Sequence, residues 1–193
     1  MATNDTTAER FRRIAGRFTE LTRDVRPDAW EQPAPCAGWT ARDVVRHLVQ
    51  WVPAVIGRSG IPLADGPNVD ADPAAAWAHL ADTLQRALDD PTVAARTFDA
   101  GPPGMLTVEA AIGMLVTGDV LVHTWDLARA TGLDEQLDAI TVGEMLAGLQ
   151  PMDAMLRASG HYGPKVEVAD DADEQTKLIA FTGRNPAWSV DRL

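Results

Sequence analysis

Cysteine and long apolar runs are both scarce in this sequence. The chain has a single cysteine, Cys36, which excludes an internal disulfide and fits a reducing compartment. No apolar run approaches the ~18 residues that a membrane-spanning helix needs. The first residues, MATNDTTAERFRR, also lack the basic start and apolar centre of a secretory signal. We therefore expect a cytoplasmic protein that has no membrane partner.

Positive charge is also in short supply. The 17 Lys and Arg residues face 28 Asp and Glu residues, which gives a formal net charge of −11. A chain this acidic repels nucleic-acid phosphates, and its one basic cluster, RFRRIAGR, is diluted by Glu9 and Glu20. Nucleic acid is therefore not an expected partner. The sequence also lacks the glycine-rich phosphate loops GxGxxG and GxxxxGK, and it has no internal repeat.

What the sequence does contain is helical periodicity. With 193 residues, of which 46% are hydrophobic, the chain can build one domain around a real core. Apolar residues recur at three- and four-residue steps within segments that end at turn-forming residues. We expect Thr40 to cap the second helix, with Asp43 completing a capping box, and Thr107 to cap the fourth. The predicted helices cover residues 7–25, 40 to the loop at 57, 73–90, 107 to about 132, 136–159, and a last stretch from the acidic DDADE to Gly183.

These helices predict an all-α fold: a four-helix bundle with extra C-terminal helices and a short extended tail segment. Loops are expected at 57–72 and 89–106, where they would form the rims of a pocket. Residues 165–168 alternate charged and apolar side chains, which predicts a short strand or an extended arm. We divide the chain into a metal-binding helical bundle over 1–160 and a tail over 161–193, whose helix packs on the bundle.

Polar residues interrupt the apolar stripes of two predicted helices. His47 lies between Val44 and Trp51 at helical spacing, and Asp119 and His123 lie four residues apart on one face of another helix. That face continues back through apolar residues as far as position 112. An aspartate on a buried face is costly unless it is paired or bound to a metal. Two imidazoles and a carboxylate suit Zn²⁺, or else Ni²⁺ or Fe²⁺, and three protein ligands leave a coordination position open, as in catalytic sites.

The same residues also have simpler interpretations. An Asp-x-x-x-His pair on a helix is more often a salt bridge or a hydrogen bond than a metal site, and spacing alone leaves this open. Asp126 is either a substitute ligand or, as we expect, a group that orients His123 or pairs with Arg129 or Arg46. Cys36 precedes a helix start, where a thiol pKa can fall, but we interpret it as a small buried residue.

The remaining histidines and the tryptophans receive no metal role. His79 and His161 fall near exposed or loop positions, and we assign them nothing. Trp39, Trp51 and Trp125 are expected mainly in the core. Of these, Trp39 and Trp125 could border an apolar substrate pocket beside the site.

Several segments of the chain resemble a known family. PCAGWTARDVVRHLVQW resembles the P-C-x-G-W helix, with its later histidine, of the DinB/YfiT-like superfamily, and is closest to actinobacterial proteins related to mycothiol-dependent maleylpyruvate isomerase. GDVLVHTWDLARATG resembles the second signature of that group, and HYGPKVEV with GRNPAW resembles its ending. The family fold is a four-helix bundle with a metal between helices. The resemblance implies that His47, Asp119 and His123 hold the metal, with Asp119 where the isomerase has a glutamate.

Two departures limit what this resemblance implies. Aspartate is one methylene shorter than glutamate, so at Asp119 either the helix lies closer to the ion, a water intervenes, or the ion binds weakly. The chain also has only a short tail where the isomerase has a larger C-terminal domain that helps to form its active site. Isomerase activity itself is therefore not implied.

The resemblance favours an enzyme, and two other functions remain open. It implies a divalent-metal-dependent enzyme, with zinc favoured, that uses mycothiol as a low-molecular-weight thiol in a transferase- or isomerase-like reaction on a small molecule. Water in place of the thiol would make it a metal-dependent hydrolase. The alternative class is a non-catalytic helical bundle that binds a metal or a small molecule, or assembles as a homodimer. An exchangeable metal ligand that faces an open cavity would favour the enzyme.

Overall fold

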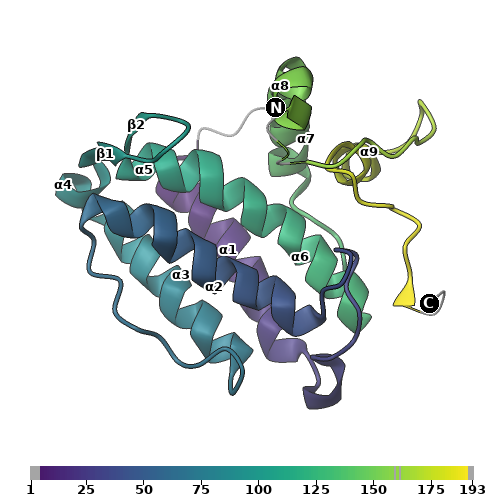
Figure 1. Cartoon of the computed structure of the whole chain (residues 1–193), viewed down its shortest axis with the longest axis horizontal. Coiled ribbons are helices and arrows are strands. Elements are labelled where there is room, and N and C mark those ends of the chain that lie inside the picture. The colour runs from purple at the N-terminus through teal and green to yellow at the C-terminus, as the bar shows by residue number, and fades with distance from the viewer. Residues whose placement is uncertain (1–4, 159, 161, 191–193) are drawn as a thin grey trace.

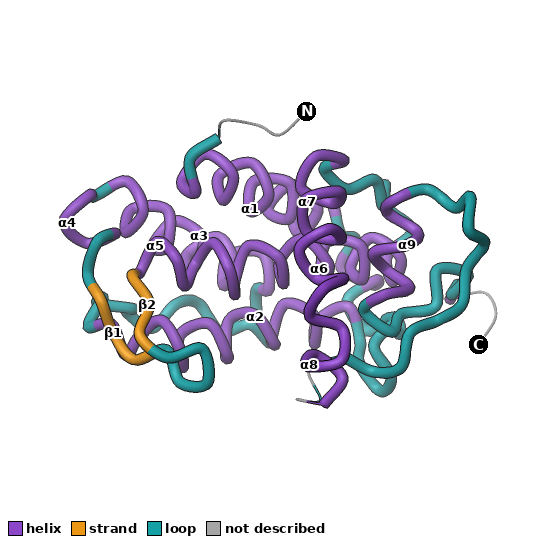
Figure 2. Tube along the Cα trace, turned by 90° about the horizontal axis from the view of Figure 1, so that it is seen from above, coloured by secondary structure: helices purple, strands orange, loops and turns teal. Residues whose placement is uncertain are grey.

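The fold is mostly helical, with a small two-stranded sheet at one end (Figures 1 and 2). The computed structural model describes residues 5–158, 160 and 162–190. Within these ranges no helix is long and apolar enough to cross a membrane. The α-helices are α1 (Thr7–Asp24), α2 (Ala41–Ile56), α3 (Pro73–Asp89), α4 (Pro91–Ala94), α5 (Val108–Ala111), α6 (Thr117–Thr131), α7 (Ala139–Leu149), α8 (Asp153–Ala158) and α9 (Glu174–Phe181). The strands are β1 (Thr97–Asp99) and β2 (Met105–Thr107).

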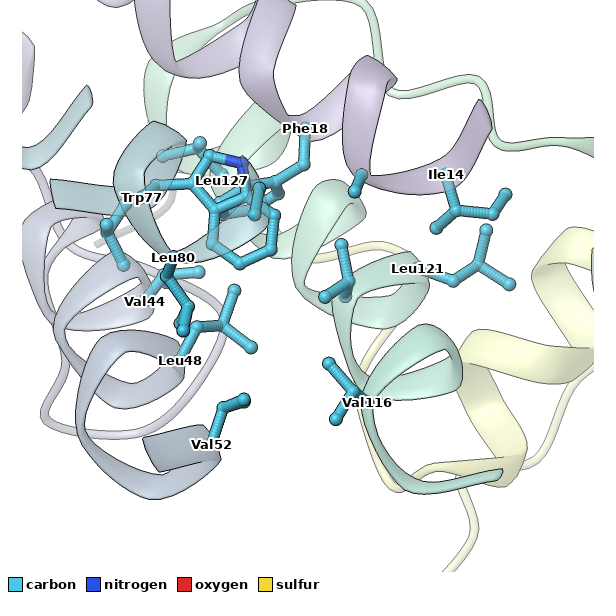
Figure 3. Close-up of a cluster of buried hydrophobic side chains, with 14 of the residues drawn as sticks. Ile14, Phe18, Val44, Leu48, Val52, Trp77, Leu80, Val116, Leu121 and Leu127 are labelled. Atoms are coloured by element: carbon cyan, nitrogen blue, oxygen red, sulfur yellow. The ribbon is translucent and has the colours of Figure 1, made fainter. Parts of the chain in front are cut away.

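The four longest helices share one hydrophobic core. Helices α1 and α2 each pack against both α3 and α6 (Figure 1). The side chains of Phe18, Leu48, Trp77 and Leu127, one from each helix, are fully buried between them (Figure 3). Burying a side chain of this size stabilises a fold by about 1.5–3 kcal/mol. The apolar stripes predicted for these helices therefore face one another.

Helix ends follow the local sequence. The hydroxyl of Thr40 accepts a hydrogen bond from the backbone N–H of Asp43, and the Asp43 carboxylate accepts one from the N–H of Thr40, which completes the predicted capping box. The Thr107 hydroxyl accepts from the N–H of Ala110 at the start of α5. Helix α6 ends at Gly132, whose φ of 70° is easy for glycine alone. These predicted helix ends are confirmed.

The predicted helix between Thr107 and Gly132 is not α-helical throughout. A π-helical segment, Ile112–Val116, separates α5 from α6. The backbone N–H and the hydroxyl of Thr117 both donate to the carbonyl of Ile112, five residues earlier. The α-helical spacing assumed from Asp119 back to position 112 therefore does not hold. π-Helical segments of this kind are often found at functional sites.

The helix predicted over 136–159 is confirmed for most of its length but is not continuous, because a turn containing proline divides it. Helix α7 ends at Leu149, a short 3₁₀ turn follows, and α8 begins at Asp153. Pro151 lies in this turn, and because its nitrogen carries no hydrogen it cannot make the backbone hydrogen bond that a continuous α-helix needs there.

The predicted loop at 89–106 contains regular structure. It holds α4 and the strand β1, which pairs antiparallel with β2. The turn between the strands uses Gly101 and Gly104, whose φ angles of 92° and 82° lie in the left-handed region. The all-α prediction is therefore incomplete, since three-residue strands are too short to show an alternating pattern.

The chain after α8 returns to the helices at the end opposite the sheet (Figure 2). Residues 165–168 form a loop rather than the predicted strand, and the N–H of Val166 donates to the carbonyl of Ala180. Helix α9 packs on α7 and ends before Gly183, as predicted. Leu178 and Ile179 of α9 join the same core as the long helices. The boundary at residue 160 stays a prediction.

Candidate functional site

Three polar side chains converge between α2 and α6. His47 lies on α2, and Asp119 and His123 lie one turn apart on α6. The Nε2 atom of His47 is 3.3 Å from Oδ2 of Asp119, and the Nε2 atom of His123 is 3.4 Å from Oδ1. One metal-binding atom of each residue lies within 4.8 Å of those of the other two. The structure thus brings together the three residues that the sequence singles out.

The cluster has a buried side and an open side. The side chain of His123 is 4% exposed, whereas those of His47 and Asp119 are 32% and 30% exposed. The half-buried ring of Trp39 lies beside both imidazoles, with centroids 5.1 Å from His47 and 5.8 Å from His123. Trp125, the other tryptophan expected near a pocket, is buried in the core. A small ligand would therefore approach past His47 and Asp119, next to Trp39.

The short side chain of Asp119 still reaches both imidazoles. Each of its two oxygens faces one of the histidines. Trp51, four residues after His47 on α2, donates its indole N–H to Oδ2 of Asp119 at 2.9 Å. The carboxylate of Asp119 therefore lies between the two imidazoles. Trp51 was expected mainly in the core, and its hydrogen bond to Asp119 was not predicted.

Asp126 orients His123 from behind. The Nδ1 atom of His123 is 2.8 Å from Oδ2 of Asp126, whose side chain is fully buried. This contact turns Nε2 toward Asp119. A carboxylate on the far nitrogen of a metal-binding histidine is the usual way in which such a ring is held. The predicted contact with His123 is confirmed, but the predicted partners Arg129 and Arg46 are wrong.

The arginine that pairs with Asp126 comes from the tail. Arg184 donates from Nε to Oδ1 at 2.9 Å and from Nη2 to Oδ2 at 2.8 Å, a two-pronged contact. The same Nη2 lies 3.6 Å from Sγ of Cys36, which is itself 3.5 Å from Oδ2 of Asp126. The segment after α9 therefore reaches into the site. Arg184 and Asp126 lie 58 residues apart in the sequence, so no local pattern could have paired them.

The local charge favours a cation on His123. Burial alone would lower the pKa of His123, but the charge of Asp119 and hydrogen bonds to Asp119 and Asp126 raise it to about 9. Burial would likewise raise the pKa of Asp119, yet the charge of His123 and hydrogen bonds with both histidines hold it well below its usual range. Without a metal, this arrangement therefore holds a proton. A divalent ion would take that proton's place.

Cys36 is not an activated nucleophile. Burial, followed by the charge of Asp126, raises the pKa of its thiol to about 12. The thiol is therefore neutral at physiological pH, which agrees with its interpretation as a structural residue rather than a catalytic one. Its place beside Asp126 and Arg184 was not foreseen, because its neighbours are distant in sequence.

The donor set fits a divalent metal ion. His47 and His123 each offer an imidazole nitrogen and Asp119 offers a carboxylate, the ligands that zinc takes in catalytic sites. Nickel and iron accept the same ligands. The orientation of His123 by Asp126 is a further feature that such sites have.

Two cavities lie elsewhere in the molecule. One, of about 410 Å³, lies between α1, α6 and the segment before α7. The other, of about 400 Å³, lies under residues 63–69, which belong to the loop expected to form a pocket rim. His79 lines this second cavity, and its Nε2 lies 3.1 Å from the carbonyl of Ala64. Neither cavity is lined by the three clustered ligands. His161 lies outside the described residues.

Known proteins match most of the chain. Residues 11–59, which include His47, match the family described as the mycothiol maleylpyruvate isomerase N-terminal domain. Two uncharacterised proteins of Mycobacterium tuberculosis, from strains CDC 1551 / Oshkosh and H37Rv, are each 32% identical over 180 residues. These matches span 86% of this chain and 91% of each relative. No solved structure matches. The chain therefore belongs to the mycothiol maleylpyruvate isomerase N-terminal domain family.

Proposed function

We propose that the chain is a divalent-metal-dependent enzyme that uses a low-molecular-weight thiol, mycothiol in this family, on a small-molecule substrate. The observation that carries the proposal is the convergence of His47, Asp119 and His123, whose metal-binding atoms lie within 4.8 Å of one another. The side chains of His47 and Asp119 are about one-third exposed, so the cluster is open to solvent on their side. Zinc is the ion that this donor set favours, with nickel and iron as alternatives. The family match supports the thiol.

Each residue of the site has a defined task in this proposal. His47 and His123 present their Nε2 lone pairs, and Asp119 supplies the negative charge. Asp126 accepts a hydrogen bond from Nδ1–H of His123, and Trp51 donates one to Oδ2 of Asp119, which holds that oxygen in place. When bound, a divalent cation supplies Lewis-acid chemistry, lowering the pKa of a coordinated thiol so that the more nucleophilic thiolate is available near neutral pH. Trp39 shields one side of the site from water.

We also propose a bundle type for the fold and a cellular compartment for the protein. Helices α1, α2, α3 and α6 would form a DinB-like four-helix bundle, and α7 to α9 would be additions to it. A reduced thiol cosubstrate requires a reducing compartment, so the proposal places the protein in the cytoplasm.

Bound metal measured by mass spectrometry on untagged protein tests the metal part. Wild type should carry near-stoichiometric zinc or nickel, and His47→Ala and Asp119→Ala should each lose it. His79→Ala is the matched control, because His79 lies at a separate cavity, and it should retain the metal. Wild type that takes up no metal, even after reconstitution, would leave Asp119 and His123 as a buried polar pair. A binding or structural role would then replace the enzyme.

The thiol part is tested on cobalt-loaded protein. Adding mycothiol to a Cys36→Ser variant loaded with Co²⁺ should produce a thiolate-to-metal absorption band in the near ultraviolet. The Cys36→Ser background ensures that the band comes from the added thiol. If the loaded protein gives no band, the thiol role is wrong, and turnover of ester or amide substrates by the same protein would then indicate the hydrolase.

A further inference from the structure

A second group of metal-binding side chains lies on the other side of His123. Cys36, His123 and Asp126 each offer an atom within 4.8 Å of those of the other two. This group meets the first one only at His123. His123 turns Nε2 toward Asp119 and Nδ1 toward Asp126, so the two groups lie against opposite nitrogens of one ring.

The distances in this second group lie near those that a single ion needs. Nδ1 of His123 is 2.8 Å from Oδ2 of Asp126, which is 3.5 Å from Sγ of Cys36. Ligand atoms bound to one tetrahedral zinc lie roughly 3.3–3.8 Å apart. The 3.5 Å separation already falls in this range, and the hydrogen-bonded atoms of His123 and Asp126 would move apart by about 0.5 Å to reach it. A sulfur ligand makes the group softer than the first one, and soft ligands favour thiophilic ions such as zinc, cadmium and copper(I).

A cation already occupies this position. The guanidinium of Arg184 contacts both oxygens of Asp126 and lies 3.6 Å from Sγ of Cys36. Its charge is permanent, because a guanidinium keeps its proton at any physiological pH. With Asp126 neutralised and the Cys36 thiol protonated, the second group has no free charge to attract an ion.

We propose that Cys36, His123 and Asp126 form a second, thiolate-containing metal site, and that Arg184 closes it by filling the place of the ion. This proposal goes beyond the proposed function and does not depend on a metal at His47. Arg184 thereby decides which nitrogen of His123 is available to a metal. Removal of the guanidinium opens the site. An ion bound there takes the Cys36 thiolate and Nδ1 of His123, the thiol proton and the Nδ1 proton pass to solvent, and Nε2–H of His123 stays directed at Asp119.

Cobalt titration of full-length protein tests this directly. Wild type should show no cobalt–thiolate band, because Arg184 excludes the ion from Cys36. Arg184→Met removes the charge but keeps an unbranched apolar side chain, and it should gain the band at one equivalent of Co²⁺. Adding Cys36→Ser should abolish the band. A band in wild type, or a folded Arg184→Met protein without one, would overturn the proposal.

A His47→Ala background separates this proposal from the proposed function. The Arg184→Met/His47→Ala protein lacks a ligand of the first group but keeps all three of the second, so the cobalt–thiolate band should persist. Loss of the band in this background would show that cobalt reaches Cys36 only through the first site, which contradicts a separate site. Failure of wild type to bind metal at His47 would not affect this result.

Cadmium provides a readout if the apoprotein of Arg184→Met unfolds. The variant leaves Asp126 buried without its partner, so its melting temperature should fall. Cadmium at about 100 times its dissociation constant should raise that temperature by roughly 5–10 °C, and only when Cys36 is present. Arg184→Gln can still donate a hydrogen bond to Asp126, so its melting temperature should fall less than that of Arg184→Met. Cadmium should raise the melting temperature of both variants. Cadmium that stabilises neither variant would refute the site.

Discussion

His123 is the residue on which most interactions of the site depend. It is almost fully buried, both of its ring nitrogens face carboxylates, and Trp39 stacks beside it. Its neighbours differ in how they are placed: Asp119 and Asp126 come from its own helix, whereas His47 comes from α2. A ring held on so many sides loses little freedom when it binds an ion, which favours tight binding.

At this scale we predict that Trp51→Phe weakens metal binding. The variant keeps an aromatic ring but removes the hydrogen bond to Oδ2 of Asp119. Loss of a group that holds a ligand typically lowers metal affinity 10- to 100-fold, and we expect a change of about tenfold. Competition with a fluorescent chelator would measure it.

Trp77→Phe is the matched control for this prediction. Trp77 also donates its indole N–H to an oxygen, the hydroxyl of Thr19, but it lies in the core away from the site. The Trp77→Phe variant should therefore have a lower free energy of unfolding but the same metal affinity as wild type. Equal affinity losses in the two variants would mean that Trp51 acts only through general stability.

Part of the site was predictable from single residues and part was not. Asp119, His123 and Asp126 share one helix, so their spacing alone places them together. Trp51 could have been found in the same way, since it lies one turn after His47 on α2. Arg184 could not, because its contact with Asp126 depends on how the tail folds back.

At the scale of elements, the start of α2 places His47 relative to α6. The Thr40 capping box begins the helix, and an isolated bridge between Pro33 and Thr40 fixes the chain before it. Capping residues satisfy backbone N–H groups that the helix itself leaves free.

Thr40→Ala should therefore destabilise the protein by about 1 kcal/mol. For a chain of this size, that corresponds to a melting temperature lower by about 2–4 °C in calorimetry. Thr131→Ala is a suitable comparison, because the Thr131 hydroxyl donates to the Leu127 carbonyl within α6 and satisfies no free N–H group. It should cost less than Thr40→Ala, and a larger loss at Thr131 would contradict the importance of the cap.

The start of α7 gives a prediction for pH dependence. Burial raises the pKa of Asp138, but hydrogen bonds from Thr141 and then the Arg13 guanidinium outweigh it and hold the pKa below its usual value. A lowered pKa means that this carboxylate stabilises the fold above the unfolded-state pKa of about 3.9, and that the stabilisation is lost as the pH falls through the lower, folded-state pKa.

Asp138→Asn should expose this effect, since asparagine also caps helices but carries no charge. At pH 7 the variant should melt about 1–3 °C below wild type, because the ion pair with Arg13 is lost. The difference should shrink as the solution is made more acidic than the usual carboxyl range. Asp134→Asn, at an exposed ion pair with Arg17, should change little at any pH. If the difference in melting temperature between wild type and Asp138→Asn instead grew as the pH fell, the pKa of Asp138 would be raised rather than lowered by folding, which would refute this prediction.

Elements were predictable where one residue controls a helix end. Thr40, Thr107, Gly132 and Gly183 all mark ends that the structure contains. The hairpin was missed because its strands are too short for a periodic signal. The π-helical segment was missed because the spacing of its apolar residues does not distinguish it from an α-helix. The unbroken helix predicted across Pro151 is wrong, because a proline inside a helix removes a backbone hydrogen bond and commonly interrupts it.

At the scale of the whole molecule, the tail completes the interior of the site. Arg184 neutralises Asp126, and Arg129 of α6 donates to the carbonyls of Pro186 and Trp188. The segment after α9 thus attaches to α6 through the Arg184 guanidinium and through these two carbonyls. A buried carboxylate would otherwise have no cation beside it, apart from the protonated ring of His123.

A chain truncated after Gly183 should therefore be much less stable. Removing one partner of a buried ion pair typically costs 3–5 kcal/mol, which corresponds to a melting temperature lower by roughly 10 °C. A chain truncated after Trp188 keeps Arg184 and the carbonyls that Arg129 contacts, so its melting temperature should stay close to that of wild type. If both truncations cost the same, the loss would not come from Arg184.

The π-helical segment Ile112–Val116 has a consequence for the alignment of relatives. A π turn spans one more residue than an α turn, so it accommodates an extra residue without displacing the α-helix that comes after it. A relative whose helix is α-helical throughout would need one residue fewer between its cap and its carboxylate ligand. Its alignment should open a one-residue gap within 112–116, which keeps its ligand opposite Asp119 instead of one position away.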